Sequence, residues 1–364
     1  MAKKIFIAAT GQNIGKTTTS LSILYRAQKK YGRVGFIKPI GPKPVTVRGV
    51  DSDKDALLMA QICGKMRDIR LMSPVVLQHD TTRKVVEGEI SADTLRQQIL
   101  HACAEMEKKC DFLVIEGAGH AGVGSVLGLS NARIAKMLNA PVLMVTGGGL
   151  GNVVDSVNMN LALFEKEGVE VRAIMANKLI PEKRASSLQF LRRCFADQRF
   201  RVMAGFDYHP VLANPTLRRI SNLLGLPVHG NKREAKRIIN HIHIGAASTQ
   251  RVVEVLEDST LLIVTSSRDE LLVTMANLYQ IPEYHEQIVG LVIPGTCAVS
   301  RITQQILERS NIPYMRAHNS TTAELYRIIT EDVSKLTAED TEKIMLVQAL
   351  AETEIDFDTL DAIF

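Results

Sequence analysis

The sequence is short of cysteine and has no long hydrophobic run. Its five cysteines form no Cys-x-x-Cys pair and are odd in number, so we expect neither a disulfide framework nor a zinc site. No apolar run reaches the ~18 residues that a membrane span needs, and the run at the amino terminus is too short for a signal peptide. These absences favour a protein of the reducing cytoplasm without a membrane partner.

A large excess of charge of one sign is also absent. Lysine and arginine number 44 against 39 acidic residues, and the net charge of +5 is spread over the chain. This balance excludes neither nucleic acid nor acidic small substrates, but it does not indicate a nucleic-acid binder, and we expect no nucleic-acid partner. Hydrophobic residues at 46 % and charged residues at 23 % are ordinary for globular proteins and exclude a disordered chain. At roughly 150 residues per domain, the 364 residues predict two domains.

Short apolar runs alternate with longer amphipathic stretches in the first two hundred residues. The runs lack polar alternation, which is typical of strands buried on both faces of a parallel sheet. They cover residues 4–10, 33–38, 111–115, 141–146, 171–176 and 200–205, and helical patterns between them include 17–30, 92–108 and 153–167. The alternation predicts right-handed βαβ units and an α/β domain with helices on both faces of a parallel sheet.

The pattern changes after residue 207, where prolines interrupt the chain. A second strand and helix alternation then runs from about residue 260 to 330 and predicts a smaller α/β domain. The last residues form two acidic helical patterns, at 338–350 and 357–363. We therefore expect domains at 1–225 and 226–335, followed by a helical tail at 336–364.

The segment from Thr10 to Thr19 follows the first strand and contains the order Gly15-Lys16-Thr17. A buried strand, a turn with converging amides and a helix that starts at Lys-Thr form a phosphate-binding loop. Lys16 would reach the β- and γ-phosphates, Thr17 would hold Mg²⁺, and Thr18 would meet the α-phosphate. Position 10 departs from the usual motif, because Thr10 replaces its first glycine. The other interpretation is a glycine-containing turn with a lysine cap, but strand, motif and helix are all in register.

Acidic residues follow other predicted elements and could hold the metal. Glu116 ends the buried strand 111–115, where a neighbouring strand should supply a ligand. Asp53 and Asp55 precede the helical stretch 56–62, and we weigh a helix N-cap equally with a metal role. Asp55 is the preferred ligand and Asp53 the second choice.

Two further polar residues end predicted strands. Lys38 follows the second strand, where it would face a second anionic group or the transferring phosphoryl, although it could be a surface lysine. Asn177 follows the strand 171–176 and can hydrogen-bond a purine. The aspartate of guanine-selective loops is absent, since position 180 is Ile180, and this favours adenine.

Two other patterns resemble functional motifs, but we assign neither of them a function. Gly117-Ala-Gly119-His-Ala-Gly122 matches a dinucleotide fingerprint, but no acidic residue lies between Glu116 and Asp155 to bind a ribose, so we exclude NAD. His241 and His243 alternate in an isoleucine-rich segment, and we expect them at a strand surface rather than as metal ligands.

These residues together resemble a known family. The loop at 10–19, Lys38-Pro39, Asp55-Ala-Leu-Leu, Glu116-Gly-Ala-Gly and Asn177 occur in this order in dethiobiotin synthetase, and residues 3–225 carry the resemblance. The chain is more similar still to the amino-terminal region of long phosphotransacetylases, in which a DRTGG domain follows, a small α/β module associated with regulation. Residues 230–335 resemble that module, with Ser267-Arg268-Asp269 and Pro294-Gly295-Thr296 in place of its two signatures.

The resemblance implies a P-loop NTPase-type sheet that binds ATP and Mg²⁺. It implies a substrate-facing Lys38, adenine contact by Asn177, and Mg²⁺ held by Thr17, Asp55 and Glu116. The phosphate contacts would come from the loop and first helical turn, namely Gln12, Asn13, Ile14, Gly15, Lys16, Thr17 and Thr18.

The sequence also departs from the family. Ala9 and Gly11 replace the usual glycine and aspartate of the loop, and Gly119-His120 replaces the Gly-Gly beside the substrate, which weakens the case for a diaminononanoate pocket. No phosphotransacetylase catalytic domain follows before Phe364, so we do not expect acetyl transfer.

We therefore expect an ATP- and Mg²⁺-binding regulatory or sensor protein with a small-molecule effector on its second domain. The alternative is an ATP-dependent ligase of the dethiobiotin synthetase type, or a weak ATPase. A third interpretation is a subunit that partners a separately encoded acyl-phosphate enzyme. By analogy with relatives of the fold, we expect a homodimer.

Overall fold

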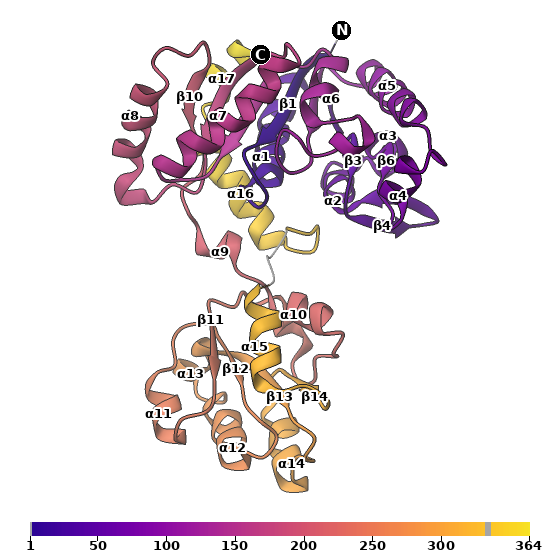
Figure 1. Cartoon of the computed structure of the whole chain (residues 1–364). Helices are drawn as coiled ribbons and strands as arrows, with labels where there is room; N and C mark the ends of the chain where they lie inside the picture. The colour runs from indigo at the N-terminus through magenta and orange to yellow at the C-terminus, as the bar shows by residue number, and fades with distance from the viewer. Residues whose placement is uncertain (1, 332–335) are drawn as a thin grey trace. The chain divides into compact units, whose positions relative to one another are not determined.

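The structure is a computed structural model that describes residues 2–331 and 336–364. The chain forms two compact units, Met1–His209 with Leu336–Phe364 and Pro210–Lys335 (Figure 1). The sequence predicts that residues 210–225 belong to the first domain, whereas in the structure they belong to the second unit. The reason is the helix α10 (Leu217–Leu224), because Leu217 and Ile220 are buried in the core of the second unit.

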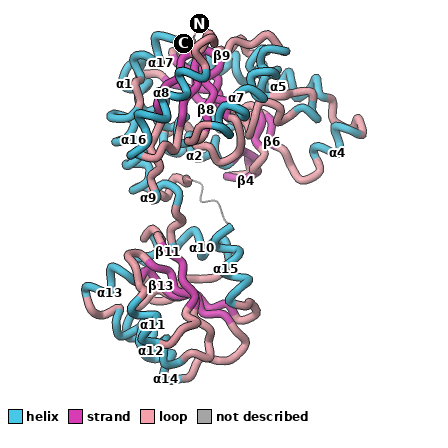
Figure 2. Tube along the Cα trace, turned by 60° about the vertical axis from the view of Figure 1, so that its left-hand side comes forward, coloured by secondary structure: helices cyan, strands magenta, loops and turns pink. Residues whose placement is uncertain are grey.

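The first unit is built on a parallel sheet of six strands. Their order is β10 (Arg201–Ala204), β9 (Val171–Ala176), β8 (Val142–Thr146), β1 (Lys3–Ala9), β7 (Phe112–Glu116) and β2 (Val34–Ile37). The central strand β1 pairs with β7 and β8, and its residues from Ile5 to Ala9 have no exposed surface. Figure 2 shows helices on both sides of the strands, so the predicted fold class is confirmed.

Helices and short strands complete the first unit. The helices are α1 (Lys16–Tyr31), α2 (Lys54–Ile62), α3 (Ile69–Met72), α4 (Thr81–Val86), α5 (Ala92–Lys109), α6 (Asn131–Met137), α7 (Gly151–Lys166), α8 (Arg184–Cys194), α16 (Thr341–Glu354) and α17 (Phe357–Ile363). The short strands are β3 (Ile40–Gly41), β4 (Pro44–Val47), β5 (Val50–Asp53) and β6 (Val75–Val76). Single 3₁₀ turns lie at Met66–Asp68, Ser125–Leu127 and Pro181–Lys183.

The predicted helical tail is the pair α16 and α17, which pack beside α1. The ring of Phe112 on β7 is near those of Tyr31 and Phe357, with centroids 5.2 Å and 6.1 Å away. Asp361 accepts hydrogen bonds from Lys3 and Tyr31 at 2.8 Å and 2.7 Å. Apolar burial and buried polar contacts therefore both fix α17 to the first unit.

The second unit is a smaller α/β domain, as the sequence predicts. Its parallel sheet has the order β11 (His241–Ile244), β12 (Thr260–Ile263), β13 (Ile288–Pro294) and β14 (Tyr314–Ala317). One face packs against α12 and α14, and the other against α10 and α15. Its other elements are α9 (Pro210–Ala213), a 3₁₀ segment (Lys232–Lys236), α11 (Thr249–Glu254), α12 (Asp269–Leu278), α13 (Pro282–Gln287), α14 (Arg301–Ser310) and α15 (Thr322–Glu331).

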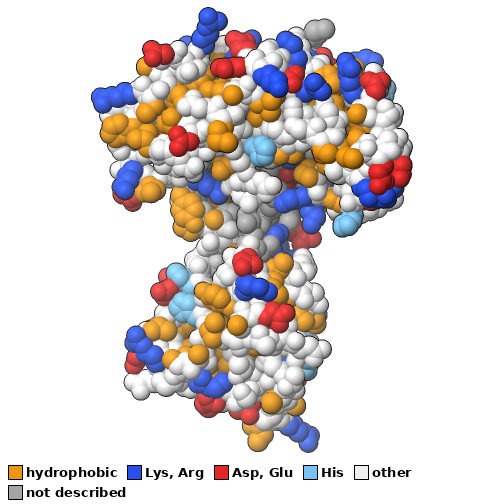
Figure 3. All heavy atoms as spheres, in the orientation of Figure 1, with side chains coloured by type: hydrophobic (Ala, Val, Ile, Leu, Met, Phe, Trp, Pro, Cys, Tyr) orange, Lys and Arg blue, Asp and Glu red, His pale blue; other side chains and the backbone are white. Residues whose placement is uncertain are grey.

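Charged side chains are spread over the face of each unit that Figure 3 shows. Figure 3 shows basic and acidic groups interspersed on the visible face, without one large patch of either sign. The five cysteines are free thiols. Among the described residues no helix combines the length and the apolar character that crossing a membrane requires.

Candidate functional site

The phosphate loop lies between the central strand and its following helix. β1 ends at Ala9 and α1 begins at Lys16, so the intervening residues cross the carboxyl edge of the sheet. Gly15 caps the helix with φ 100°, and a Cβ there would lie 2.1 Å from the Asn177 amide nitrogen. Only glycine fits this position, because an L side chain would meet both the positive φ and the amide.

The backbone amides of this loop are available to a ligand. Within the described residues, the N–H groups from Gly11 to Gly15 donate no hydrogen bond to the chain. Amides at a helix start carry partial positive charge and have no intrahelical acceptor. Several such groups along one turn form a cradle for an anion.

Lys16 reaches back across the loop. Its ammonium donates hydrogen bonds to the carbonyls of Gly11 and Gly119, at 3.2 Å and 2.9 Å, and the residue is only 8 % exposed. Gly119 belongs to the loop after β7, so Lys16 connects two loops at the same edge of the sheet. Gln12 and Asn13 are exposed on the loop, while Ile14, Thr17 and Thr18 are half-buried.

Three charged groups meet beside the loop. The Lys38 ammonium lies 2.6 Å from Asp55 Oδ2 and 2.7 Å from Glu116 Oε1. The hydroxyl of Thr17 donates a hydrogen bond to the same Glu116 oxygen at 3.2 Å. Burial lowers the pKa of Lys38, but Glu116 and Asp55 raise it by more, so the pKa of Lys38 lies above its usual value. The structure thus brings together four residues that the sequence singled out.

Asp53 and Asp55 have separate roles. The Asp53 carboxylate accepts from the Asp55 backbone N–H at 2.8 Å and from that of Lys43 at 3.0 Å, which makes Asp53 the N-cap of α2. Burial, the largest influence, raises the pKa of Asp53. Capping occupies Asp53, and Asp55 is the carboxylate that points to Lys38 and the site. The helix-cap interpretation weighed from the sequence therefore applies to Asp53, while a metal role for Asp55 stays a prediction.

The donor set fits Mg²⁺. Glu116 is fully buried, and its Oε2 accepts no hydrogen bond from the described chain, which leaves a buried carboxylate oxygen without a partner. Thr17 and Asp55 supply further oxygen atoms beside it. Mg²⁺ prefers oxygen ligands, with one or two carboxylates and the rest from water and phosphate.

Asn177 stabilises the phosphate loop through hydrogen bonds. Its Nδ2 donates to the Ile14 carbonyl at 2.9 Å, and its Oδ1 accepts from the Phe206 N–H at 2.9 Å. The side chain is 2 % exposed. The structure therefore gives Asn177 a loop-supporting role that its sequence context does not indicate, and its contact with adenine stays a prediction.

Two buried asparagines that the sequence analysis did not single out also support the site. Asn160 of α7 accepts from the Ala121 N–H at 2.8 Å and donates to the Thr10 carbonyl at 3.3 Å. Asn131 of α6 accepts from the Ala118 N–H and donates to the Ala118 carbonyl. Both lie in helices far along the chain from the motif, so no local sequence signal marks them.

In the second unit, two arginines bind the loops at the carboxyl edge of the sheet. Arg268 donates to the carbonyls of Gly245, Ala246 and Ala247 at 3.0–3.3 Å. Arg316 donates in the same way to the carbonyls of Ile293, Gly295 and Cys297 at 2.6–2.8 Å. Each arginine thus holds together the loop that follows a strand.

The two signature segments of this unit lie side by side. The Ser266 N–H donates to the Pro294 carbonyl at 2.8 Å. Gly295 has φ 108°, and a Cβ there would lie 2.9 Å from Ser266 Oγ. The close approach requires glycine at position 295, which explains a glycine in the second signature.

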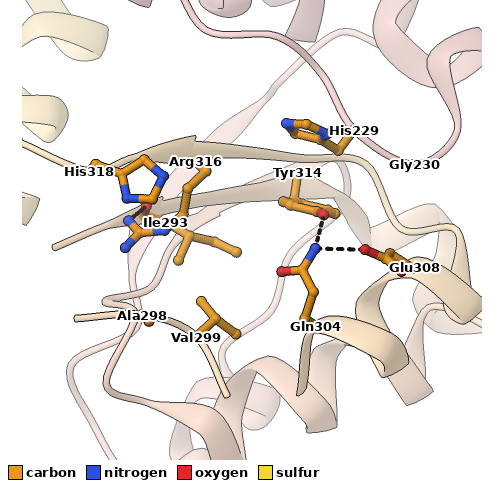
Figure 4. A pocket seen from close by; sticks show the side chains of 10 residues that line it. All are labelled: His229, Gly230, Ile293, Ala298, Val299, Gln304, Glu308, Tyr314, Arg316 and His318. Carbon is orange, nitrogen blue, oxygen red and sulfur yellow. Dashed lines mark hydrogen bonds between the residues drawn. The ribbon is translucent and has the colours of Figure 1, made fainter. Parts of the chain in front are cut away.

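A pocket of about 510 Å³ lies beside β14 (Figure 4). The ring of His229 stacks on that of Tyr314 at 5.0 Å, and Gln304 donates to the Tyr314 hydroxyl and to Glu308. Arg316 pairs with no carboxylate among the described residues. The lining residues are His229, Gly230, Ile293, Ala298, Val299, Gln304, Glu308, Tyr314, Arg316 and His318.

Comparison with known proteins identifies relatives of both units. A family model described as an AAA domain matches residues 3–216, and one described as a DRTGG domain matches residues 220–330. The phosphate acetyltransferase of Synechocystis sp. is 23 % identical over 299 residues, covering 80 % of this chain and 42 % of that protein. The phosphate acetyltransferase of Pseudomonas putida is 25 % identical over 280 residues, and the match covers 74 % of this chain and 39 % of that protein. This chain thus spans less than half the length of these relatives.

A second group of relatives matches the first unit. ATP-dependent dethiobiotin synthetase from Methanocaldococcus jannaschii is 27 % identical over 178 residues, covering 48 % of this chain and 78 % of that protein. These matches confirm the resemblance inferred from the loop and its surrounding residues. The AAA model covers more than half of the chain. The protein therefore belongs to the AAA domain family, with a P-loop domain of the dethiobiotin synthetase type followed by a DRTGG domain.

Proposed function

We propose that the protein binds ATP with Mg²⁺ in its first unit and acts as a regulatory or sensor protein. The observation that carries this proposal is the loop between β1 and α1, in which the N–H groups from Gly11 to Gly15 have no acceptor in the described chain. An anion with several oxygens would satisfy these amides together. A triphosphate is such an anion.

The residues around the loop have distinct roles in this proposal. Lys16 exchanges the carbonyls of Gly11 and Gly119 for the β- and γ-phosphates. Thr17, Asp55 and Glu116 hold Mg²⁺, and the unpaired Glu116 oxygen gains a partner. When bound, Mg²⁺ neutralises charge on the phosphate oxygens. Asn177 keeps the loop in shape and contacts the adenine edge.

The substrate side of the site favours a regulatory role over ligation. Lys38 is 3 % exposed, and both of its ion pairs are with the carboxylates of Asp55 and Glu116. His120 stands exposed where the resembled synthetases have a second glycine. A retained phosphate site beside an altered substrate site supports nucleotide sensing.

The second unit would receive an effector in the pocket beside β14. Arg316 has no carboxylate partner among the described residues, and His318 also lines the pocket. A cation without a counter-charge attracts an anion. We therefore propose a small anionic molecule as the effector.

Calorimetric titration with ATP, ADP and GTP in the presence of Mg²⁺ tests nucleotide binding. We expect the wild type to bind ATP more tightly than GTP, and Lys16→Ala to weaken ATP binding by more than about tenfold, since a charge-assisted phosphate contact is lost. Lys183→Ala, at an exposed lysine outside the site, is the matched control. Absence of ATP binding to the wild type would overturn the proposal.

The alternative is an ATP-dependent ligase of the dethiobiotin synthetase type. The retained cluster of Lys38, Asp55 and Glu116 favours it, because these residues belong to the shared motif set. In that case ADP release would require both diaminononanoate and bicarbonate. Slow ADP release that is independent of these substrates would instead indicate a weak ATPase.

We also propose that the protein forms a homodimer and acts on a separate acyl-phosphate enzyme. The similarity to phosphate acetyltransferases supports this partner, since those proteins match both units of this chain. Light scattering with and without ATP measures the oligomeric state. Co-purification from the native cell, followed by identification of retained proteins, tests the partner.

A further inference from the structure

A cluster of nitrogen and oxygen ligands lies at the edge of the second sheet, outside both sites described above. Among the residues that the structure describes, β11 pairs with β12 alone and is an edge strand. His241 and His243 occupy alternate positions on β11, so their side chains share one face of the sheet. Glu257 precedes β12, and His241 pairs in register with Thr260 of that strand. Strand pairing therefore brings Glu257 to the two histidines.

The side chains converge on one point. Glu257 Oε2 lies 2.5 Å from His241 Nδ1 and 3.9 Å from His243 Nε2. One ligand atom from each residue lies within 4.8 Å of the other two. His243 Nε2 is too far from the carboxylate for a hydrogen bond and makes none elsewhere in the described chain. One carboxylate oxygen therefore faces two imidazole nitrogens but satisfies only one of them.

The chemistry of these donors favours a transition metal. Two neutral imidazoles and a carboxylate carry one negative charge, which attracts a divalent cation. Nitrogen ligands suit Zn²⁺, Co²⁺ and Ni²⁺, whereas Mg²⁺ prefers oxygen alone. The Mg²⁺ proposed for the first unit therefore would not compete well here.

The geometry allows this coordination after small movements of the side chains. Zn–N and Zn–O bonds of about 2.0–2.2 Å in a tetrahedron place ligand atoms roughly 3.3 Å apart. Spacings of up to 4.8 Å must therefore shorten. The side chains are 42 %, 30 % and 52 % exposed, in the order His241, His243 and Glu257, so solvent and not packed protein surrounds their outer parts. Rotation about their own side-chain bonds closes the site.

We propose that His241, His243 and Glu257 bind one divalent transition-metal ion of the zinc class, with water in the fourth position. The ion would tie the edge strand β11 to the segment that precedes β12. This reverses the interpretation made from the sequence, where alternation alone suggested a plain strand surface. The third ligand, Glu257, lies outside the isoleucine-rich segment, so only the fold reveals it.

Zinc titration of the 364-residue chain, first stripped with a chelator, tests this site without relying on nucleotide binding. We expect one equivalent of Zn²⁺ to bind the wild type, and Co²⁺ in its place to give the visible absorption of a four-coordinate nitrogen and oxygen site. His241→Ala and His243→Ala should each raise the dissociation constant by more than about tenfold, and Glu257→Gln should also weaken binding.

Two controls keep the test interpretable. His101→Ala removes an exposed histidine of the first unit, and Glu254→Gln neutralises an exposed carboxylate of the second unit outside the site; both should leave zinc binding unchanged. Circular dichroism shows whether each variant is folded, and Glu257→Gln is the mildest change if an alanine variant unfolds. The proposal is overturned if the wild type binds no zinc, or if the His241→Ala/His243→Ala double variant binds as tightly as the wild type.

Discussion

The ammonium of Lys38 lies within 2.7 Å of both Asp55 and Glu116, so one cation joins the end of β7 to α2. All three side chains are nearly or fully buried. The Lys38 charge therefore neutralises carboxylates that would otherwise repel each other out of contact with water. The same two carboxylates are the proposed Mg²⁺ ligands, so stability and metal binding share one electrostatic site.

Lys38→Met should destabilise the first unit by about 3–5 kcal/mol, because removing one member of a buried ion pair leaves the other charges uncompensated. Urea unfolding measures the change. Added Mg²⁺ should stabilise the variant more than the wild type, since a dication can replace the lost ammonium. Lys54→Met, at an exposed lysine next to Asp55, should change stability little. Equal loss in both variants would contradict the role of Lys38.

Gly15→Ala should reduce ATP affinity by more than about tenfold while the protein stays folded. The new Cβ would lie 2.1 Å from the Asn177 amide, so the hydrogen bond to the Ile14 carbonyl breaks and the cradle deforms. Gly32→Ala is the control for the strain of a positive φ alone, since Gly32 also has a positive φ but nothing lies within 4 Å of a Cβ added there. Calorimetry should show normal ATP binding in Gly32→Ala, with stability lower by about 1 kcal/mol.

Stability should fall at alkaline pH because of buried thiols. Burial raises the pKa of Cys103 to about 12 and that of Cys110 to about 11, from an ordinary value of 9.0. Above pH 9 the unfolded chain loses thiol protons that the native chain keeps, so the unfolded state binds fewer protons and the free energy of unfolding decreases as pH rises. Well below pH 9 both thiols are protonated in the folded and unfolded states, so they do not make the free energy of unfolding depend on pH.

Urea unfolding at several values between pH 8 and pH 11 measures this dependence. Cys103→Ala/Cys110→Ala should flatten the decline, whereas Cys194→Ala/Cys297→Ala, at exposed thiols, should leave it unchanged. A slope that is identical in all three proteins would show that other groups cause the alkaline loss.

Arg316→Ala should destabilise the second unit by about 1–3 kcal/mol, because three carbonyl oxygens lose a charged donor. With inorganic phosphate as the probe anion, the same variant should also lose phosphate binding in the pocket. Arg309→Ala removes an exposed arginine on α14 and serves as the control. Thermal unfolding with and without phosphate separates the two effects, since only ligand binding depends on phosphate concentration.

The sequence predicts those parts of the fold that depend on local signals. Buried strands appear as continuous apolar runs, and the order Gly15-Lys16-Thr17 marks the loop because strand, turn and helix start are adjacent in the chain. Glu116 and Lys38 could be placed because the ends of parallel strands meet at one edge. These inferences needed no tertiary information beyond the direction of the strands.

Contacts between distant segments could not be predicted in this way. Asn160 supports the phosphate loop from α7, and neither its residue type nor its neighbours mark that role. The division between Asp53 as a helix cap and Asp55 as a site residue depends on which carboxylate faces Lys38 after folding. Glu257 likewise reaches the two histidines only through the pairing of β11 with β12.

The return of the final helices to the first unit has a consequence for how the chain responds to cleavage. The polypeptide passes between the two units twice, after His209 and before Leu336. The DRTGG unit is thus an insertion, tethered at both its ends. A single protease nick in either crossing would leave both halves attached, because the other crossing is intact and the Lys3–Asp361 contact anchors the final helix.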